Sequence, residues 1–329
     1  MPILDASSQD AIERAADALA AGEVVAIPTE TVYGLAVDAA QPQAVRRLFA
    51  LKERPAAHPL PVLVADAAAA QHFAASVPPA AEKLMAAFWP GALTLVLPRK
   101  EGVVEEAAGG QANIALRCSA HPVVQRLLAA CAARGIAGLA CPSANRFGRI
   151  SSTTAAHVAA EFGDELPVLD GGACSVGIES SIVDCTKKML VLLRPGAVAR
   201  EAIERTAGAA LVGRDALSKT AAEEAQSGHY APRAKVRLMD GKMLKTALEL
   251  LGAQAKNIAV WARDPLKSAS SKLLLRRMPD DAEAAAHELF AVLRSFDDAG
   301  VKLIWVQEPP AGSEWEGVRD RLRRAAAAQ

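Results

Sequence analysis

The sequence predicts a two-domain α/β protein, and three observations support this prediction. The chain has 329 residues, enough for about two domains of roughly 150 residues each. Short apolar runs rich in β-branched residues alternate with alanine-rich stretches whose apolar residues recur at helical spacing. The composition changes from about residue 207, and residues 215–233 are polar and alanine-rich. We therefore expect a first domain over 1–206, a linker over 207–233 and a second domain over 234–329.

The first domain begins with a predicted helix, because Ser7 and Ser8 precede an amphipathic pattern that Gly22 ends. Further helices are expected over 44–51, where Pro55 forces the chain out, and over 122–133, where Pro122 suits a first turn. Others are expected at 66–76, 79–88 and from the Ser151–Thr154 cap to about Phe162. Apolar runs predict strands at 24–27, 35–37, 61–64, 93–97, 114–116, 136–140, 167–169, 181–185 and 190–193.

The second domain shows the same alternation on a smaller scale. Strands are expected at 236–239, 258–261 and 301–306, and helices near 242–251, 281–295 and 315–325. This order predicts a small doubly wound, Rossmann-like domain of three layers. Its first turn lacks a G-x-G-x-x-G, and Gly241-Lys242 lacks the preceding glycine of a P-loop. The second domain therefore carries no nucleotide-binding fingerprint.

Charge and cysteine usage limit the class of protein. Lys and Arg number 37, as do Asp and Glu, which argues against a generally basic nucleic-acid binder. The five cysteines are scattered without a C-x-x-C, so we expect reduced thiols and no zinc site. We see no signal peptide, and no stretch approaches the ~18 apolar residues of a membrane span. A cytoplasmic protein without membrane contact is expected.

The segment Pro28–Gly34 is the first candidate for function. It follows a buried strand, which Pro28 ends because proline has no N–H to donate, and Gly34 allows the backbone to turn. Two threonines, a glutamate and a tyrosine are thus presented at a strand end, where α/β sheets bind ligands. The alternative is a polar turn between two strands.

Other polar residues follow strand or helix ends in the same domain. Lys52 and Arg54 end a helix, where cations also offset the helix dipole, so a charged last turn is the alternative interpretation. Arg117 and Arg194 leave apolar strands and need an anionic partner. The remaining candidates are Thr29, Thr31, His58, Ser143, Asn145, Ser151, Ser180 and Ser181. Together they indicate a cleft for an anion, with neither a metal cage nor a nucleophile.

Several of these motifs resemble the Sua5/YrdC/YciO family in order and spacing. They are Pro28-Thr-Glu-Thr-Val-Tyr-Gly34, Lys52-x-Arg54-Pro55, Trp89-Pro-Gly-Ala-Leu-Thr94, Pro142-Ser-Ala-Asn145, Ser180-Ser181 and Leu193-Arg-Pro-Gly196. The segment His229-Tyr-Ala-Pro232 before a second α/β domain is similar to the two-domain Sua5 type of L-threonylcarbamoyladenylate synthase. The resemblance covers nearly the whole chain.

The resemblance implies a fold, a reaction and partners. The first domain would be a twisted, open, mixed (YrdC-like) sheet with a concave, positively charged cleft. The enzyme would convert L-threonine, bicarbonate and ATP, with Mg²⁺, into threonylcarbamoyl-AMP and pyrophosphate. The product would pass to downstream tRNA threonylcarbamoyl-transferase proteins for N6-threonylcarbamoyladenosine at tRNA position 37, with a possible RNA contact.

The resemblance also assigns residues. Thr31, Arg117 and Ser180, with the backbone at Cys141, would hold threonine, and Lys52, Arg54, Ser143, Asn145, Ser151 and Arg194 would hold ATP. Lys52 and Arg54 would also neutralise charge during the reaction. His58 and Asn113 depart from the family pattern but are expected to reach ATP, whereas Leu63 replaces a threonine-contacting histidine. Tyr230 and the linker would close over the cleft as a lid.

Two competing interpretations stay open. The first is a double-stranded RNA or ribosome-binding module that uses the same cleft, although such modules need a large basic face. The second is a carbamoyltransferase of the hydrogenase-maturation type, which contains a similar domain. Against this second interpretation, the sequence has no cysteine pairs for zinc modules and no extra catalytic domains.

Overall fold

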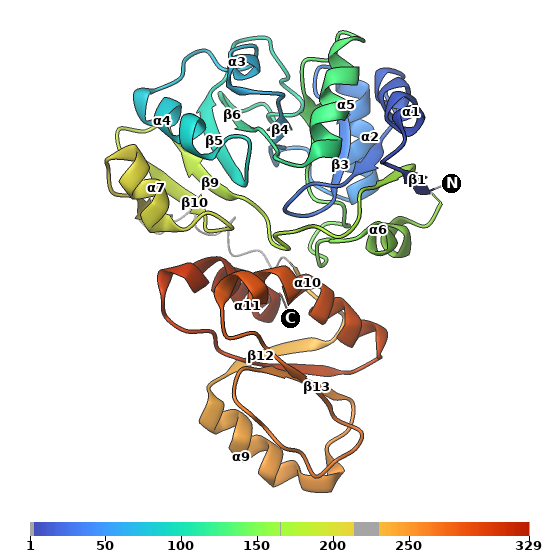
Figure 1. Ribbon diagram of the computed structural model, residues 1–329, viewed down its shortest axis with the longest axis vertical. Helices are drawn as coiled ribbons and strands as arrows, with labels where there is room; N and C mark the ends of the chain where they lie inside the picture. Colours follow the sequence, from blue (N-terminus) through green and yellow to red (C-terminus); the bar gives the residue numbers. More distant parts are fainter. Residues whose placement is uncertain (1–2, 165, 214–229, 329) are drawn as a thin grey trace. The chain divides into compact units, whose positions relative to one another are not determined.

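A computed structural model describes residues 3–164, 166–213 and 230–328 (Figure 1). The chain forms two compact units: Met1–Phe147 with Ser151–Leu217, and Gly148–Ile150 with Ser218–Gln329. Residues 214–229, which make up most of the predicted linker 207–233, lie outside the described residues. Among the described helices, none combines the length and the apolar character that crossing a membrane requires.

A mixed sheet runs through the first unit and joins eleven described strands in the order β1-β8-β2-β3-β7-β4-β6-β5-β9-β10-β11. The strands are β1 (Ile3–Asp5), β2 (Val25–Ile27), β3 (Gly34–Asp38), β4 (Val62–Leu63), β5 (Leu93–Pro98), β6 (Asn113–Arg117), β7 (Leu139–Ala140), β8 (Val168–Asp170), β9 (Ser181–Asp184), β10 (Val191–Arg194) and β11 (Val212–Gly213). β2 and β3 are antiparallel, whereas β5 and β9 are parallel. The predicted mixed α/β sheet is confirmed.

Helices bury both faces of this sheet, which is why its strands read as continuous apolar runs. They are α1 (Gln9–Ala20), α2 (Pro42–Lys52), α3 (Ala67–Ala70), α4 (Pro79–Phe88), α5 (Pro122–Ala132), α6 (Ala155–Phe162) and α7 (Arg200–Ala207). In β2, Val25 and Ile27 join the apolar cluster of α1 and α5, whereas Ala26 joins the cluster of α2, α4, α6 and α7. Alternate residues of one strand thus serve two cores.

The second unit has a parallel sheet in the order β12-β15-β13-β14. Its strands are β12 (Lys235–Met239), β13 (Ile258–Ala262), β14 (Leu274–Arg277) and β15 (Leu303–Gln307), and its helices are α9 (Gly241–Leu251), α10 (Ala282–Asp298) and α11 (Glu316–Ala327). Short 3-10 turns lie at Gly252–Gln254 and Ser313–Trp315. Figure 1 shows α9 on one face of the sheet and α10 and α11 on the other, which confirms the predicted three layers.

The structure differs from the predicted elements at several places. Helix α7 and strands β1, β11 and β14 were not expected; β14 is exposed along its whole length, so it lacks the apolar pattern of a buried strand. The expected helix over 66–76 forms only as α3, because the chain after it bonds to β5: the backbone N–H of Ala75 donates to Pro98 O at 2.8 Å. The first sheet also continues past residue 206, since β11 pairs with β10.

Candidate active site

The segment after β2 is a compact turn held by Thr29. The Thr29 hydroxyl accepts from the backbone N–H groups of Thr31 at 3.1 Å and Val32 at 3.2 Å, and donates to Val32 O at 2.6 Å. Its oxygen also lies 2.9 Å from the hydroxyl oxygen of Thr31. Both threonines are buried. The segment is therefore a polar turn whose threonines point into the protein rather than into solvent, and its role in binding stays a prediction.

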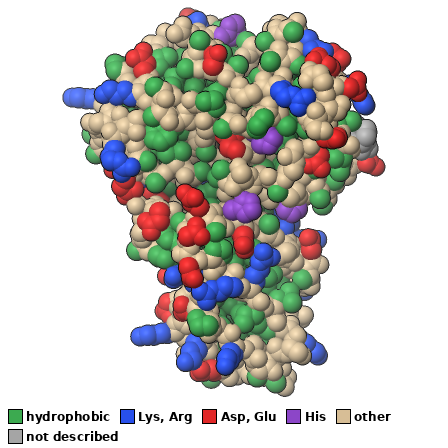
Figure 2. Space-filling model, in the orientation of Figure 1, with side chains coloured by type: hydrophobic (Ala, Val, Ile, Leu, Met, Phe, Trp, Pro, Cys, Tyr) green, Lys and Arg blue, Asp and Glu red, His purple; other side chains and the backbone are tan. Residues whose placement is uncertain are grey.

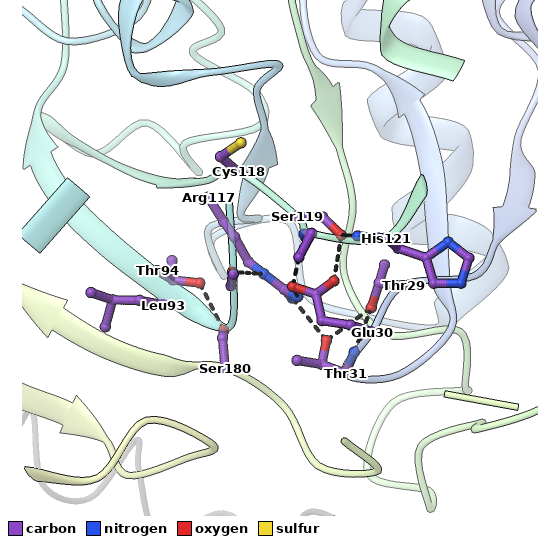
Figure 3. A network of polar contacts seen from close by, with 12 residues as sticks. Thr29, Glu30, Thr31, Leu93, Thr94, Arg117, Cys118, Ser119, His121 and Ser180 are labelled. Atoms are coloured by element: carbon purple, nitrogen blue, oxygen red, sulfur yellow. Dashed lines mark hydrogen bonds and ion pairs between the residues drawn. The ribbon is translucent and has the colours of Figure 1, made fainter. Parts of the chain in front are cut away.

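Arg117, the last residue of β6, lies at the centre of a buried polar network (Figure 3). Its Nη1 donates to Thr31 Oγ1 at 2.8 Å, its Nε donates to Gly91 O at 3.1 Å, and its Nη2 lies 2.7 Å from Glu30 Oε1. Figure 3 places Thr31 on one side of Arg117 and Ser180 with Thr94 on the other. The structure thus brings the predicted threonine-binding side chains into one neighbourhood.

Glu30 supplies an anionic partner for the buried charge of Arg117. Burial by itself would raise the pKa of the Glu30 carboxyl, but the charge of Arg117 and hydrogen bonds from Ser119, Arg117 and the Ala120 backbone together hold that pKa below its usual range. The Glu30 side chain is therefore a carboxylate at neutral pH. Two charges buried together cost little only when they are paired and hydrogen-bonded, as they are here.

Ser180 connects β5, β9 and β10 at the other side of the network. Its hydroxyl lies 2.7 Å from Thr94 Oγ1, and Arg194 donates to the Ser180 carbonyl from Nε at 3.1 Å and from Nη2 at 2.9 Å. A Cβ at Gly196 would come within 2.5 Å of the backbone of residues 179–181. The Arg194-Pro-Gly turn can therefore pack against Ser180 only with glycine at that position.

Among the predicted nucleotide-binding residues, Lys52, Ser143 and Asn145 meet at the backbone of the segment after β7, whereas Arg54 and Ser151 bond to other partners. Lys52 ends α2 and donates from Nζ to the carbonyls of Ser143 and Asn145, both at 2.5 Å. Ser151 Oγ donates to Glu179 Oε1 at 2.5 Å, and Arg54 donates to Pro59 O at 3.0 Å. Lys52 therefore links α2 to the Ser143–Asn145 backbone.

Lys52 is only 2% exposed, and this burial changes the pKa of its amine. Desolvation, followed by the nearby charge of Arg54, lowers the pKa of the amine from 10.5 to about 7. The unfolded chain holds this proton up to its higher pKa, whereas the folded protein releases it near neutrality. The folded state is thus penalised at low pH, and the penalty is relieved as pH rises above about 7.

This pKa predicts a pH-dependent difference in stability between the protein and a Lys52→Met variant. Between about pH 7 and 9, the free energy of unfolding of the unmodified protein should increase relative to that of the variant, by up to about 1.4 kcal/mol per pH unit. Urea unfolding of both proteins across this range measures the difference. A difference that is flat with pH would mean that Lys52 keeps an ordinary pKa.

The remaining predicted site residues make contacts of their own, and Cys141 lies near enough to Arg117 and Lys52 for their charges to act on its thiol. The His58 ring centroid is 5.6 Å from that of Phe147, and Asn113 begins β6. Cys141 is buried, which raises the pKa of its thiol to about 12, so the sulfur stays protonated. The Tyr230 ring packs within the second unit, 5.3 Å from the ring of Phe290, and the guanidinium of Arg321 lies 5.5 Å from its centroid. The lid proposed for Tyr230 stays a prediction.

Sequence reasoning left four participants without a role. Glu30 lies in the recognised loop, and Thr94 ends the recognised Trp89–Thr94 motif, so position in a motif could have flagged both. Ser119 and Glu179 could be found only from the fold. Each interacts with a residue far away in the sequence: Ser119 with Glu30, and Glu179 with Ser151. All five cysteines fall in the described chain as free, buried thiols. Within the described residues no cluster of three or more His, Cys, Asp or Glu side chains could hold a metal ion.

Comparison with known proteins shows the family of this chain. The family model described as "Telomere recombination", Sua5_yciO_yrdC, matches residues 17–196, and the model described as "Threonylcarbamoyl-AMP synthase, C-terminal domain" matches residues 198–327. The threonylcarbamoyl-AMP synthase of Pyrococcus abyssi is 34% identical over 95% of this chain and 93% of its own, and that of Bacillus subtilis is 32% identical over 96% and 92%.

A solved structure agrees with the sequence relatives over both units. The crystal structure of P. abyssi Sua5 complexed with L-threonine matches with a TM-score of 0.86 at 31% identity, covering 98% of this chain and 95% of that one. The match includes the predicted smaller α/β domain as well as the large mixed sheet. The chain belongs to the Sua5/YrdC/YciO family, as a two-domain member of the Sua5 type.

Proposed function

We propose that this protein is an L-threonylcarbamoyladenylate synthase, which makes threonylcarbamoyl-AMP and pyrophosphate from L-threonine, bicarbonate and ATP. One observation carries the proposal: a buried arginine, Arg117, is held between Glu30, Thr31 and the Gly91 carbonyl, in a chain that matches a Sua5 structure complexed with L-threonine. A guanidinium fixed in this way suits the planar, two-oxygen carboxylate of an amino acid.

On the threonine side, Arg117 binds the carboxylate and Thr31 and Ser180 supply hydroxyl groups for the remaining polar atoms. Arginine has five N–H donors, and the three contacts within the protein leave donors for a substrate in the same plane. The backbone at Cys141 completes this side of the site. The Cys141 thiol takes no part in the chemistry, because a protonated buried thiol is a poor nucleophile.

On the nucleotide side, Lys52 and Arg54 face the phosphates, while Ser143, Asn145, Ser151 and Arg194 position the rest of ATP. His58 and Asn113 are proposed as further contacts, and Tyr230 as part of a lid. Lys52 acts partly through the backbone, because it holds the carbonyls of Ser143 and Asn145. The loop that carries these two side chains is thereby given one conformation before ATP arrives.

Mg²⁺ fits this site as an ion carried by ATP. Mg²⁺ in nucleotide sites keeps several waters and is held largely by phosphate oxygens rather than by a protein cage. The described residues offer no such cage, and the buried carboxylate of Glu179 lies on the nucleotide side, hydrogen-bonded to Ser151. When bound, the ion would neutralise phosphate charge; Lys52 and Arg54 add positive charge from the protein.

The proposed reaction joins three substrates in two steps. Threonine's amine and bicarbonate give a carbamate with loss of water, and a carbamate oxygen attacks the α-phosphorus of ATP. The new O–P bond forms as the bond to the β-phosphate bridging oxygen breaks, and pyrophosphate leaves with the electron pair. Such transfers depend chiefly on positioning and charge neutralisation. The product's transfer to tRNA by other proteins, in the cytoplasm, is part of the proposal.

Incubation with ATP, Mg²⁺, bicarbonate and labelled threonine tests the function. We expect pyrophosphate and a labelled threonyl adduct of AMP, both dependent on threonine and bicarbonate. A protein that forms neither, but binds double-stranded RNA with a steep salt dependence, would instead be the RNA-binding module. Against that alternative, Figure 2 shows Lys and Arg interspersed with Asp and Glu over the visible face of the first unit, and not one broad basic field.

Amino-acid selectivity gives a further prediction. Leu63 of β4 is buried in the apolar cluster that includes Leu139 and Cys141, so it offers no polar contact in place of a histidine. Threonine and serine then differ chiefly by the packing of one methyl group, which is worth about 1–3 kcal/mol. We expect kcat/KM to favour threonine over serine by less than ~200-fold. A much larger ratio, measured under the same conditions, would mean that packing of the methyl group alone does not account for the preference.

A further inference from the structure

We propose that Glu30 is a positioning residue for amino-acid binding: it holds the guanidinium of Arg117 in the orientation that receives the carboxylate of threonine. This inference rests on the proposed function and adds to it a residue that the sequence left without a role. Glu30 itself need not touch the substrate. Its effect is exerted through Arg117, and the geometry around both side chains supports this division of roles.

Glu30 is anchored from the segment that follows β6. Its Oε2 accepts a hydrogen bond from Ser119 Oγ, and its Oε1 accepts one from the backbone N–H of Ala120 at 3.1 Å. Each carboxylate oxygen therefore has a partner other than Arg117, so the carboxyl plane is fixed independently of the arginine. A carboxylate fixed in this way can orient a neighbouring cation instead of following it.

Arg117 depends on three partners that approach different edges of its guanidinium. Nε donates to Gly91 O, Nη1 donates to Thr31 Oγ1, and Nη2 lies 2.7 Å from Glu30 Oε1. Of these three, Glu30 alone carries a charge. The Arg117 and Glu30 side chains are only 8% and 10% exposed, so water screens their attraction little. Because the guanidinium is planar and rigid, fixing three edges also fixes the directions of its other N–H bonds.

The backbone of the same loop supports the other threonine-binding side chain. Val176 N donates to Glu30 O at 2.8 Å and Gly177 N donates to Thr31 O at 3.1 Å, which holds the segment that leads to Ser180. A substitution of the Glu30 side chain keeps these backbone bonds. Side-chain variants of Glu30 therefore test its link to Arg117 and leave the Ser180 segment in place.

The main test compares Glu30→Gln with the unmodified protein in the adenylate assay. Glutamine keeps the size and an acceptor oxygen but removes the charge. We expect the KM for threonine to rise at least ~10-fold, while the KM for ATP stays within about twofold, because only ground-state binding of threonine is weakened. Calorimetric titration with threonine gives a second readout that does not depend on turnover. Equal losses for both substrates, or a fall in kcat alone, would indicate a merely structural residue and overturn the proposal.

Asp184→Asn is the matched control. Asp184 is also a buried carboxylate of the first unit, but its side chain accepts from the neighbouring Thr186, through N at 2.8 Å and Oγ1 at 2.6 Å, and not from a site residue. Neutralising it should lower the melting temperature without changing either KM. A change in the threonine KM of this control similar to that of Glu30→Gln would show that the effect is general destabilisation.

A double-mutant cycle tests the route through Arg117. If Glu30 acts by orienting Arg117, Glu30→Gln should weaken threonine binding much less in an Arg117→Lys background than in the unmodified protein. Full additivity would overturn the proposal. Should Glu30→Gln fail to fold, Ser119→Ala, which removes one anchor of the carboxylate, must still raise the threonine KM by a few fold, and an unchanged KM would count against the proposal. If the unmodified protein itself binds no threonine, the proposed function, and not only the role of Glu30, would be wrong.

Discussion

Replacing Lys52 with alanine or methionine is expected to reduce adenylate synthesis about 100-fold or more at subsaturating ATP. The amine donates to two buried backbone carbonyls, of Ser143 and Asn145, and below its pKa of about 7 it is a charged donor, whose hydrogen bonds are worth about 1.5–3 kcal/mol each. Loss of both bonds frees the loop that carries two predicted ATP-binding side chains. It also removes positive charge from the nucleotide side, so we expect both a higher KM for ATP and a lower kcat.

Lys52→Met is the more informative variant, because it keeps the packing of the buried side chain while removing both donors. Lys188→Met is its control: Lys188 is an exposed lysine of the same unit, in the turn after β9. Arg54→Ala should lose roughly tenfold, since it removes one charged donor to Pro59 O and charge near the phosphates. Steady-state kinetics with varied ATP measures all four proteins. An unchanged KM and kcat in Lys52→Met would remove Lys52 from the nucleotide site.

The fold was predictable wherever a local pattern reported burial. β2 and β13 are apolar at every position because both faces of their sheets are covered, so short apolar runs sufficed to find them. β1 and β14 had no such pattern. β1 exists because three residues pair in parallel with β8, more than 160 positions along the chain, and β14 pairs with β13 while its side chains stay exposed. Long-range pairing of this kind leaves no local mark in a sequence.

The site was predictable in its residues but not in its contacts. A motif identified Thr31, and the apolar strand before it drew attention to Arg117, yet the bond between them spans 86 positions, and those from Lys52 to Ser143 and Asn145 span 91 and 93. The sequence predicted that Lys52 would contact phosphate. It did not predict the hydrogen bonds from Lys52 to the carbonyls of Ser143 and Asn145, because backbone carbonyls have no sequence signature. Glu30 was missed for a related reason: a glutamate in a polar turn is usually solvated, and only the fold shows it buried against Arg117.

Arg117 gives the second large expected effect, on threonine rather than on ATP. Arg117→Ala would leave Glu30 as a buried, unpaired carboxylate, at a cost of about 3–5 kcal/mol in stability, so loss of activity could reflect loss of fold. Arg117→Lys avoids this ambiguity because it keeps a positive charge beside Glu30. A lysine has its three donors on one nitrogen, so it cannot reach Gly91 O, Thr31 Oγ1 and Glu30 together and still offer a fork to a carboxylate.

We therefore expect Arg117→Lys to raise the KM for threonine at least ~10-fold, the equivalent of about 1.4 kcal/mol or more of lost binding, while the KM for ATP changes by less than about twofold. Arg134→Lys serves as the control, since Arg134, just after α5, also pairs with two acids, but these are Glu13 and Asp17 of α1 at the protein surface, where such pairs contribute little. Kinetics with varied threonine at saturating ATP provide the measurement. If Arg117→Lys binds threonine as tightly as the unmodified protein, the carboxylate is held elsewhere, and both the threonine site and the role of Glu30 must be reassigned.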